Sequence, residues 1–308
     1  MTAGYEGRRP VVVVTGANGF VGSRTCSALA VGGATVRAIV RRAGAAPSLP
    51  GVEELVGDFF DPDLARAAVA GADAVVSTVH PMGADRATQQ RIAVEGTPAL
   101  TRAARDAAVG RFVHVSTAGV YDRRPGVGDV DEDSALVGDD ANDYAVTKRD
   151  TDLALSRVDG LTRVLVRPPA ILGSGESSVW NTLRPAEMRD DAAERQVNPD
   201  KTFAWVHVDD LVRLVVDVAL GEIGEAREPA HGPVAGGCTA VNVAAAPAAS
   251  RSYYETVTSA IGAEPVWDDQ PAWTGRIRAE RAHRWGWEPT IDLPRALAEL
   301  ESDLTGAG

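Results

Sequence analysis

The sequence predicts an α/β protein built on a doubly wound parallel sheet, with a smaller second domain in the C-terminal half. Short apolar runs alternate with helix-length, alanine-rich stretches through the first half of the chain, which is typical of parallel strands covered by helices on both faces. Right-handed crossovers then give the doubly wound arrangement. After about Gly173 the alternation weakens, and segments rich in Pro, Trp and charged residues follow.

Six of the apolar runs have the length of buried strands. They cover residues 11–15, 35–40, 51–56, 74–78, 112–116 and 163–167. Helical patterns separate most of these runs, at residues 21–30, 62–70, 87–108 and 144–157. We expect residues 8–172 to form the first domain, with segments near 203–221 and 239–245 returning to it, and residues 173–308 to form most of the second.

Composition narrows the function classes. The 308 residues carry a net charge of −12, so a nucleic-acid partner, which requires clustered positive charge, is not expected. Cys26 and Cys238 are too few for a disulfide framework, and the five histidines lack metal-ligand spacing, so no metal is expected. No run is apolar over enough residues for a signal peptide or a membrane span. We therefore expect a soluble, cytoplasmic protein with no membrane partner.

The turn after the first strand has the spacing of a dinucleotide-binding loop. In the segment T-G-A-N-G-F-V-G, Gly16 permits a tight turn, Gly19 lets the backbone approach a pyrophosphate, and Gly22 lets the next helix pack close to the strand. Free N–H groups at the helix N-terminus favour a bound phosphate. The alternative is an ordinary glycine-rich turn between a strand and a helix.

The end of the second strand indicates which dinucleotide binds. NAD sites place an acidic residue there to hold the ribose 2′-hydroxyl. This chain has Val40, followed by Arg41 and Arg42, whose guanidinium groups suit the 2′-phosphate of NADP. NADP(H) is therefore favoured over NAD(H), unless the two arginines are solvated loop charges. Asp58 either accepts a hydrogen bond from the adenine amino group or caps the helix that starts near residue 62.

A candidate catalytic pair lies on the helix predicted at residues 144–157. Tyr144 and Lys148 are four residues apart and therefore share one helix face. A nearby ammonium lowers the pKa of a tyrosine, which can then exchange a proton with a substrate oxygen. Lys148 and Lys201 are the only lysines in the chain, so chance explains this spacing less easily than in an average protein.

Polar residues at the end of the strand at 112–116 extend the candidate site. The hydroxyl of Ser116 or Thr117 can hold a substrate carbonyl oxygen beside Tyr144, unless both are ordinary strand-end polar residues. With these motifs, the chain resembles the extended short-chain dehydrogenases/reductases, of the nucleotide-sugar epimerase/dehydratase and dihydroflavonol-reductase type. The segments that carry the resemblance are T-G-A-N-G-F-V-G, V-R-A-I-V-R-R, G-D-F-F-D-P, V-S-T-A-G-V-Y, Y-A-V-T-K, R-P-P-A-I-L-G, W-V-H-V-D-D-L and W-G-W-E-P-T-I-D-L.

The resemblance implies a Rossmann-like cofactor domain, hydride transfer at a carbon bearing oxygen, and roles for individual residues. It implies Thr117 as the catalytic hydroxyl, Tyr144 as the acid/base, and Lys148 as the residue that binds the ribose and lowers the tyrosine pKa. The residues expected to contact the cofactor are Gly16, Asn18, Gly19, Phe20, Val21, Gly22, Arg41, Arg42, Asp58, Phe59, Ser77, Thr78, Val79, Ser116, Tyr144, Lys148, Pro168, Ala170 and Ile171. A homodimer through the helices at 87–108 and 144–157 is implied as well.

Departures from the family pattern reduce the number of reactions that we expect the chain to catalyse. Sugar dehydratases of the family carry Asp-Glu after the catalytic Thr, whereas this chain has Ala118 and Gly119, which cannot exchange protons. Ala93 replaces the Asn of the family's N-V-x-G-T motif, which normally helps to organise the cofactor side of the site. Epimerases of the group retain NAD, while Arg41 and Arg42 favour an NADP that enters reduced and leaves oxidised. We therefore expect a net reductase rather than a 4,6-dehydratase.

The substrate end is the least specific part of the sequence. Its expected lining consists of His80, Met82, Thr117, Tyr121 and the segment from 173 to about 201, which supplies Arg184 and Lys201. Nucleotide-sugar members of the family use cations in this segment for the diphosphate, but Arg184 lies near Glu187, so surface pairing is the default explanation for it.

The expected function is an NADPH-dependent ketoreductase that reduces a ketone to a secondary alcohol. Two substrate classes are expected: a nucleotide-activated keto-deoxysugar, or a secondary-metabolite ketone of the kind made in antibiotic biosynthesis. One alternative is an NAD-retaining nucleotide-sugar epimerase. The other, of a different class, is a non-catalytic, cofactor-sensing regulatory protein on the same fold.

Overall fold

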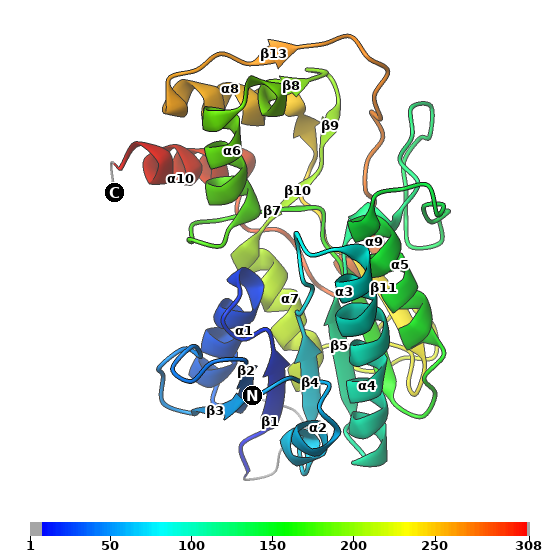
Figure 1. Cartoon of the computed structure of the whole chain (residues 1–308). Coiled ribbons are helices and arrows are strands. Elements are labelled where there is room, and N and C mark those ends of the chain that lie inside the picture. Colours follow the sequence, from blue (N-terminus) through cyan, green and yellow to red (C-terminus); the bar gives the residue numbers. More distant parts are fainter. Residues whose placement is uncertain (1–7, 307–308) are drawn as a thin grey trace.

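The computed structural model describes residues 8–306, which form a layered α/β part and a smaller part built mainly from the C-terminal half (Figure 1). Seven strands make one sheet in the order β11-β6-β5-β4-β1-β2-β3. These strands are β1 (Val11–Thr15), β2 (Thr35–Val40), β3 (Val52–Val56), β4 (Ala74–Ser77), β5 (Arg111–Val115), β6 (Thr162–Arg167) and β11 (Cys238–Asn242). All neighbouring strands pair in parallel. The predicted doubly wound α/β class is therefore confirmed.

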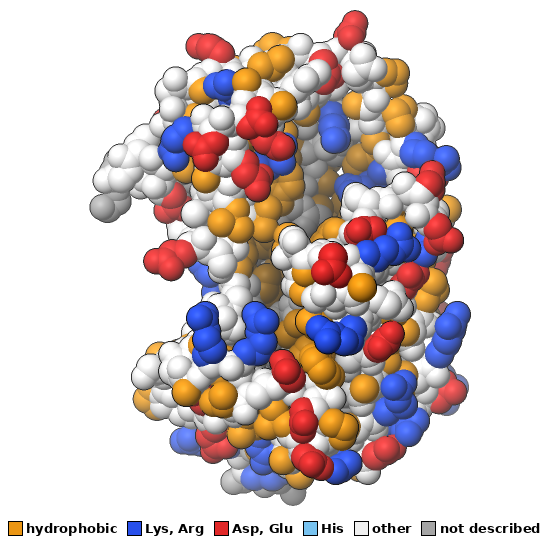
Figure 2. Space-filling model, in the orientation of Figure 1, with side chains coloured by type: hydrophobic (Ala, Val, Ile, Leu, Met, Phe, Trp, Pro, Cys, Tyr) orange, Lys and Arg blue, Asp and Glu red, His pale blue; other side chains and the backbone are white. Residues whose placement is uncertain are grey.

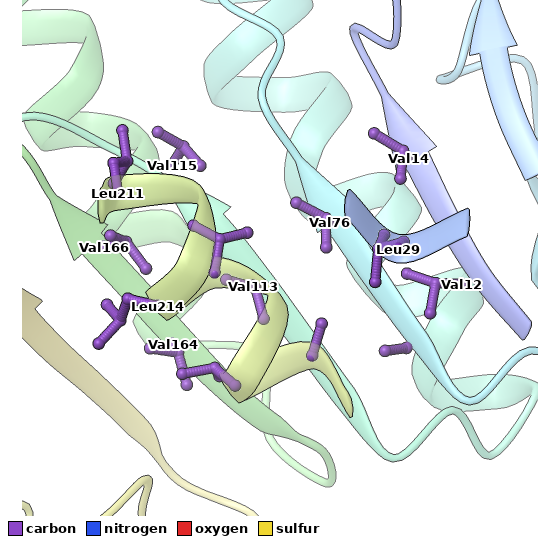
Figure 3. Close-up of a cluster of buried hydrophobic side chains, with 14 of the residues drawn as sticks. Val12, Val14, Leu29, Val76, Val113, Val115, Val164, Val166, Leu211 and Leu214 are labelled. Atoms are coloured by element: carbon purple, nitrogen blue, oxygen red, sulfur yellow. The ribbon is translucent and has the colours of Figure 1, made fainter. Parts of the chain in front are cut away.

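Each face of the sheet has its own core. Val12 and Val14 point to one face, where they pack with α1 (Phe20–Val31) and α7 (Val208–Leu220), as Figure 3 shows. Val13 points to the opposite face and packs with α2 (Pro62–Val69), α4 (Thr97–Asp106) and α5 (Asp143–Ser156). Because both faces are covered, the central strand β1 is apolar from Val11 to Val14, which is the pattern expected of a strand buried on both faces.

The helix expected at 87–108 is divided in the structure. It consists of α3 (Arg86–Gln89), a π-helical segment η1 (Gln90–Gly96) and α4. Pro98, at the start of α4, has no N–H to donate to the carbonyl four residues earlier, so a regular α-helix cannot run through this point. The π-helical turn lies against α5, the helix that carries Tyr144 and Lys148.

The second part has a separate aromatic core. Phe203 and Tyr253 stack with ring centroids 4.8 Å apart, and Trp205 and Leu300 lie in the same cluster. The elements of this part are β7 (Ala170–Leu172), η3 (Val179–Leu183), α6 (Arg184–Asp190), η4 (Ala192–Arg195), β8 (Gln196–Val197), β9 (Thr202–Phe203), β10 (Trp205–His207), β12 (Ala248–Ala249), α8 (Ser250–Ile261), β13 (Val266–Trp267) and α10 (Leu293–Thr305). β10 leads directly into α7, so the two cores are joined by continuous chain.

A buried carboxylate ties the C-terminal segment to the sheet layer. Asp210, in the first turn of α7, accepts hydrogen bonds from the Thr290 hydroxyl at 2.7 Å, the Thr290 N–H at 3.0 Å and the Ile291 N–H at 3.1 Å. The Asp210 carbonyl also accepts from the Trp287 indole at 2.8 Å. These bonds fix the segment that follows the short helix α9 (Glu280–Arg284) and enters α10. Among the described residues, no helix combines the length and apolarity needed to cross a membrane.

Candidate active site

The turn between β1 and α1 is shaped by two glycines. Gly16 has a φ of 69°, a left-handed conformation that favours glycine, and its carbonyl accepts a hydrogen bond from Gly19 N–H at 2.9 Å. A Cβ on Gly22 would lie 2.0 Å from the Gly16 oxygen, so only glycine fits there without moving the backbone. The Thr78 hydroxyl donates to the Thr15 carbonyl at 2.8 Å and ties this turn to the end of β4.

The N-terminus of α1 is open to an anion. Its N-cap, Gly19, offers no side-chain hydrogen bond, and the first turn contains no acidic residue. The free N–H groups of that turn therefore point outward with the positive end of the helix dipole. Together with the close approach of Gly16 and Gly22, these groups fit the pyrophosphate of a dinucleotide.

The residues expected at the adenosine end differ in their surroundings. Arg41 and Arg42 are exposed after β2, and within residues 8–306 neither side chain forms an ion pair or a hydrogen bond. Asp58 does not cap α2, because Asp61 does so by accepting from two backbone N–H groups at 3.0 Å. The capping alternative for Asp58 is therefore wrong. The Phe59 side chain is buried in the core on the Val13 face of the sheet.

Thr117 and Tyr144 come together from different elements. Thr117 ends the strand segment and begins the short helix η2 (Ala118–Val120), where its hydroxyl accepts from Gly119 N–H at 3.0 Å and faces the Pro168 carbonyl at 3.4 Å. Tyr144 lies in the first turn of α5. A Cβ built on Gly119 would lie 3.3 Å from Thr117 Oγ1 and 3.8 Å from Tyr144 Cε1. The two candidate catalytic side chains therefore flank Gly119.

The pKa of Tyr144 differs from the expectation. Burial raises it, the neighbouring Thr117 hydroxyl opposes that rise, and the charge of Asp152 adds to it. The expected lowering by Lys148 is not what this geometry produces. The phenol therefore stays protonated at neutral pH and can act as a hydrogen-bond donor and a proton donor.

Lys148 points into the protein rather than toward Tyr144. Its side chain is buried, with 4% of the residue exposed, and Nζ donates to the Val115 carbonyl at 2.8 Å. Burial lowers its pKa to about 8, while the carboxylate of Asp152, one helical turn farther along α5, opposes this lowering. The charge on Lys148 therefore depends on Asp152.

Asp152 begins a buried series of hydrogen-bonded side chains that was not predicted from the sequence. Its carboxylate pairs with Arg167 Nε at 2.9 Å, and Arg167 Nη1 donates to the Tyr121 hydroxyl at 2.9 Å. That hydroxyl donates to Asn242 Oδ1 at 2.7 Å. Tyr121 is 1% exposed, so the expectation that it lines the substrate site is wrong: the aromatic ring is core, and its hydroxyl joins β6 to β11. The four-residue spacing from Lys148 was the signal that could have identified Asp152.

His80 lies against the ring of Tyr144. The two rings meet edge to face with centroids 4.9 Å apart, and His80 Nε2 lies 3.1 Å from Gln89 Oε1. The same Gln89 oxygen accepts from the Thr147 hydroxyl at 2.8 Å. Burial and the charge of Lys148 lower the pKa of His80 to about 3, so its imidazole is neutral at physiological pH. The expected neighbourhood of His80 and Tyr144 is thus present, with Gln89 as an unpredicted member.

Other expected residues are distributed more widely. Ser77 and Ser116 are buried at strand ends, while Ala170 and Ile171 are partly exposed on β7. Met82 is 58% exposed. Arg184 pairs with Glu194 at 3.2 Å and donates to the Tyr254 hydroxyl at 2.9 Å, so the expected pairing with Glu187 is wrong. Figure 2 shows the surface hollowed between the two parts of the molecule, with basic side chains at the edge of the hollow.

Comparisons with known proteins point to cofactor-binding enzymes. The sequence model of a family described as NAD(P)H-binding matches residues 16–197. A 4-hydroxy-2-methyl-3-oxo-4-farnesyl-3,4-dihydroquinoline-1-oxide ketoreductase from Stigmatella aurantiaca is 34% identical over 173 residues, which cover 54% of this chain and 51% of that relative. The chain thus spans about half the length of the first curated relatives it matches. A dTDP-glucose 4,6-dehydratase from Streptomyces niveus is 30% identical over 264 residues, 75% of this chain and 74% of that enzyme.

The fold also has close counterparts among solved structures. The Bordetella bronchiseptica enzyme WbmG, in complex with NAD, superimposes with a TM-score of 0.76 at 20% identity, covering 98% of this chain and 96% of that one. At this identity the likeness establishes the fold alone. The overall fold of this chain is therefore one that also occurs in a structure solved in complex with NAD.

Proposed function

Because the chain belongs to the NAD(P)H-binding extended short-chain dehydrogenase/reductase family, we propose that it is an NADPH-dependent ketoreductase that converts a ketone to a secondary alcohol. The observation that carries the proposal is the pair Thr117 and Tyr144 on either side of Gly119, with a protonated phenol at Tyr144. The proposed substrate is a nucleotide-activated keto-deoxysugar or a secondary-metabolite ketone. The Stigmatella ketoreductase supports the ketone chemistry.

The proposed reaction assigns one task to each side chain. A bound NADPH supplies the hydride that the carbonyl carbon receives. The Thr117 hydroxyl holds the carbonyl oxygen, and Tyr144 gives that oxygen its proton. Lys148, charged below about pH 8 and held by the Val115 carbonyl, is assigned to the ribose of the bound cofactor, the role that the resemblance implies. Ala118 and Gly119 supply no acid or base, which argues against the dehydration named for the Streptomyces relative.

The proposal is tested by mixing purified protein with NADPH and a panel of ketones and following the loss of NADPH absorbance. Consumption that depends on both protein and ketone supports the reductase. Protein that instead carries tightly bound NAD, and consumes no NADPH with any ketone, would support the NAD-retaining epimerase. The homodimer expected from the resemblance stays part of the proposal, with the helical segment at 87–108, which comprises α3, η1 and α4, and the helix α5 as its contact surfaces.

The preference for NADPH is expected to depend on Arg41 and Arg42. Replacing both with Ala removes the charge-assisted hydrogen bonds proposed for the 2′-phosphate, so the KM for NADPH should rise roughly tenfold to a hundredfold. The KM for NADH should stay within about twofold, because NADH has no 2′-phosphate. Initial rates with each cofactor measure both values. Arg227→Ala, at another exposed arginine that forms no ion pair with any residue from 8 to 306, is the control, and an equal loss for both cofactors would contradict the prediction.

The pH dependence of the reaction rate is expected to follow the charge on Lys148, which the nearby carboxylate of Asp152 helps to maintain. The wild-type rate should fall as the pH rises through about 8, where Lys148 loses its charge. In Asp152→Asn the carboxylate that raises the Lys148 pKa is gone, so this alkaline limb should move to lower pH. Rates measured across the pH range at saturating cofactor test the shift. Asp150→Asn, which only breaks the ion pair with Arg149, should leave the limb in place, and an unmoved limb in Asp152→Asn would refute the coupling.

A further inference from the structure

Two basic side chains on one side of the molecule have no acidic partner. Within residues 8–306, neither Arg123 nor Lys201 forms an ion pair or a side-chain hydrogen bond. Arg123 is half-buried, two residues after the anchored Tyr121, and Lys201 is solvent-accessible just before β9. The chain has 43 acidic residues and a net charge of −12, so unpaired cations here are not explained by a shortage of carboxylates.

A tryptophan brings the two cations to the same place. The Arg123 guanidinium lies 5.3 Å from the centre of the Trp273 ring, within the range of a cation–π contact. The Trp273 carbonyl accepts from the N–H of Thr202, the residue after Lys201, at 3.0 Å. The Trp273 indole donates to the Gly128 carbonyl at 2.9 Å, which fixes the ring against the segment that carries Arg123. Three distant segments are therefore held together at Trp273.

The electrostatics of this cluster are unfavourable without an anion. Desolvation and then the charges of Arg123 and Arg184 lower the pKa of Lys201, and only Asp268 opposes them. Arg184 is partly neutralised by its pair with Glu194, whereas Arg123 and Lys201 are not. Like charges gathered in partly desolvated surroundings repel one another, and an added negative charge removes that repulsion.

We propose that Arg123 and Lys201 form a subsite for an oxyanion carried by the substrate, either a phosphoryl or a carboxylate group. The proposal rests on the proposed function and narrows its substrate to anionic ketones. Arg123 lies six residues after Thr117, and the chain between them is anchored by the buried Tyr121 hydroxyl. In this proposal the ketone carbonyl lies at Thr117 and Tyr144, and the charged group of the same substrate reaches Arg123 and Lys201.

The subsite is tested by calorimetric titration of protein saturated with NADP, so that the phosphate loop is already filled. Inorganic pyrophosphate and succinate are the two probes, and each is titrated into wild type, Arg123→Gln, Lys201→Gln and the double variant. The wild type is expected to bind at least one probe, and each single variant should bind it about tenfold more weakly or worse. Arg189→Gln, at an exposed and unpaired arginine on α6, should bind like wild type.

The outcomes separate the subsite from the reaction. Tighter binding of pyrophosphate supports a phosphoryl group, and tighter binding of succinate supports a carboxylate. Wild-type affinity in both single variants, or no binding of either probe, overturns the subsite. Oxidation of NADPH by wild-type protein with a neutral ketone reports the proposed function separately, so a reductase without the subsite, or a subsite without reductase activity, is recognised as such.

Discussion

Tyr144→Phe is expected to lower kcat/KM for ketone reduction by roughly 10²–10⁴-fold, the range that loss of a positioned acid usually costs. The variant keeps the ring that packs edge to face on His80 and removes only the hydroxyl. The proton for the product oxygen must then come from water, while Thr117 and the cofactor loop are untouched. Initial rates with NADPH and the best ketone of the panel measure the loss, and NADPH titration of the variant should give wild-type affinity.

A second tyrosine provides a matched control. Tyr253→Phe removes a hydroxyl that donates to the Trp180 carbonyl in the core of the second part, so it should lower stability by about 1 kcal/mol and leave kcat nearly unchanged. If Tyr144→Phe instead retains every measurable activity and phenotype, the acid role is wrong. The cofactor-sensing regulatory protein would then be the better description of this chain.

Gly22→Ala is expected to disable the cofactor loop. The new Cβ would lie 2.0 Å from the Gly16 oxygen and 2.9 Å from the Thr78 hydroxyl, so α1 must move away from the turn. Overpacking of this kind costs about 1–3 kcal/mol of stability, and a similar loss in the free energy of cofactor binding would weaken that binding roughly tenfold to 10²-fold. Thermal unfolding and titration with NADPH measure the two effects.

Gly224→Ala controls for the loss of a glycine as such. A Cβ at Gly224 meets no atom within 4 Å, so this variant should keep both its stability and its NADPH affinity. Wild-type affinity in Gly22→Ala would mean that the cofactor does not depend on the tight contact between Gly16 and Gly22. The proposed position of the pyrophosphate at the start of α1 would then be wrong.

The layered part of the fold follows closely from local sequence signals. Strands β1 and β2 begin and end where their apolar runs do, because burial on both faces favours apolar side chains along most of each strand. The glycine turn was equally predictable from the sequence. The positive φ of Gly16 and the lack of space for a Cβ at Gly22 are both requirements of the backbone itself. The division of the helix before α4 was not foreseen, although Pro98 marked the place.

The residue types of the site were predictable from the sequence, but the directions in which the side chains point were not. Spacing placed Tyr144 and Lys148 on one helix face, yet Lys148 turns to Val115, a contact that depends on how α5 lies on the sheet. Asp152 shares that face and was legible by the same spacing. No sequence pattern predicts a role for Arg123, because the side chain that it contacts, Trp273, lies 150 residues later in the chain. Arg184 pairs with Glu194 rather than with Glu187 because the chain folds back between them.

The scarcity of lysine gives the protein an unusual chemical handle. Of its two side-chain amines, that of Lys148 on α5 is buried against the Val115 carbonyl, and that of Lys201 is accessible near Arg123. The lowered pKa of Lys201, caused by desolvation and by Arg123 and Arg184, leaves more of this amine unprotonated and nucleophilic near neutral pH than an ordinary lysine. An acylating reagent therefore meets one accessible side-chain amine, beside Arg123, and the extent of its labelling becomes a gauge of what occupies the proposed subsite.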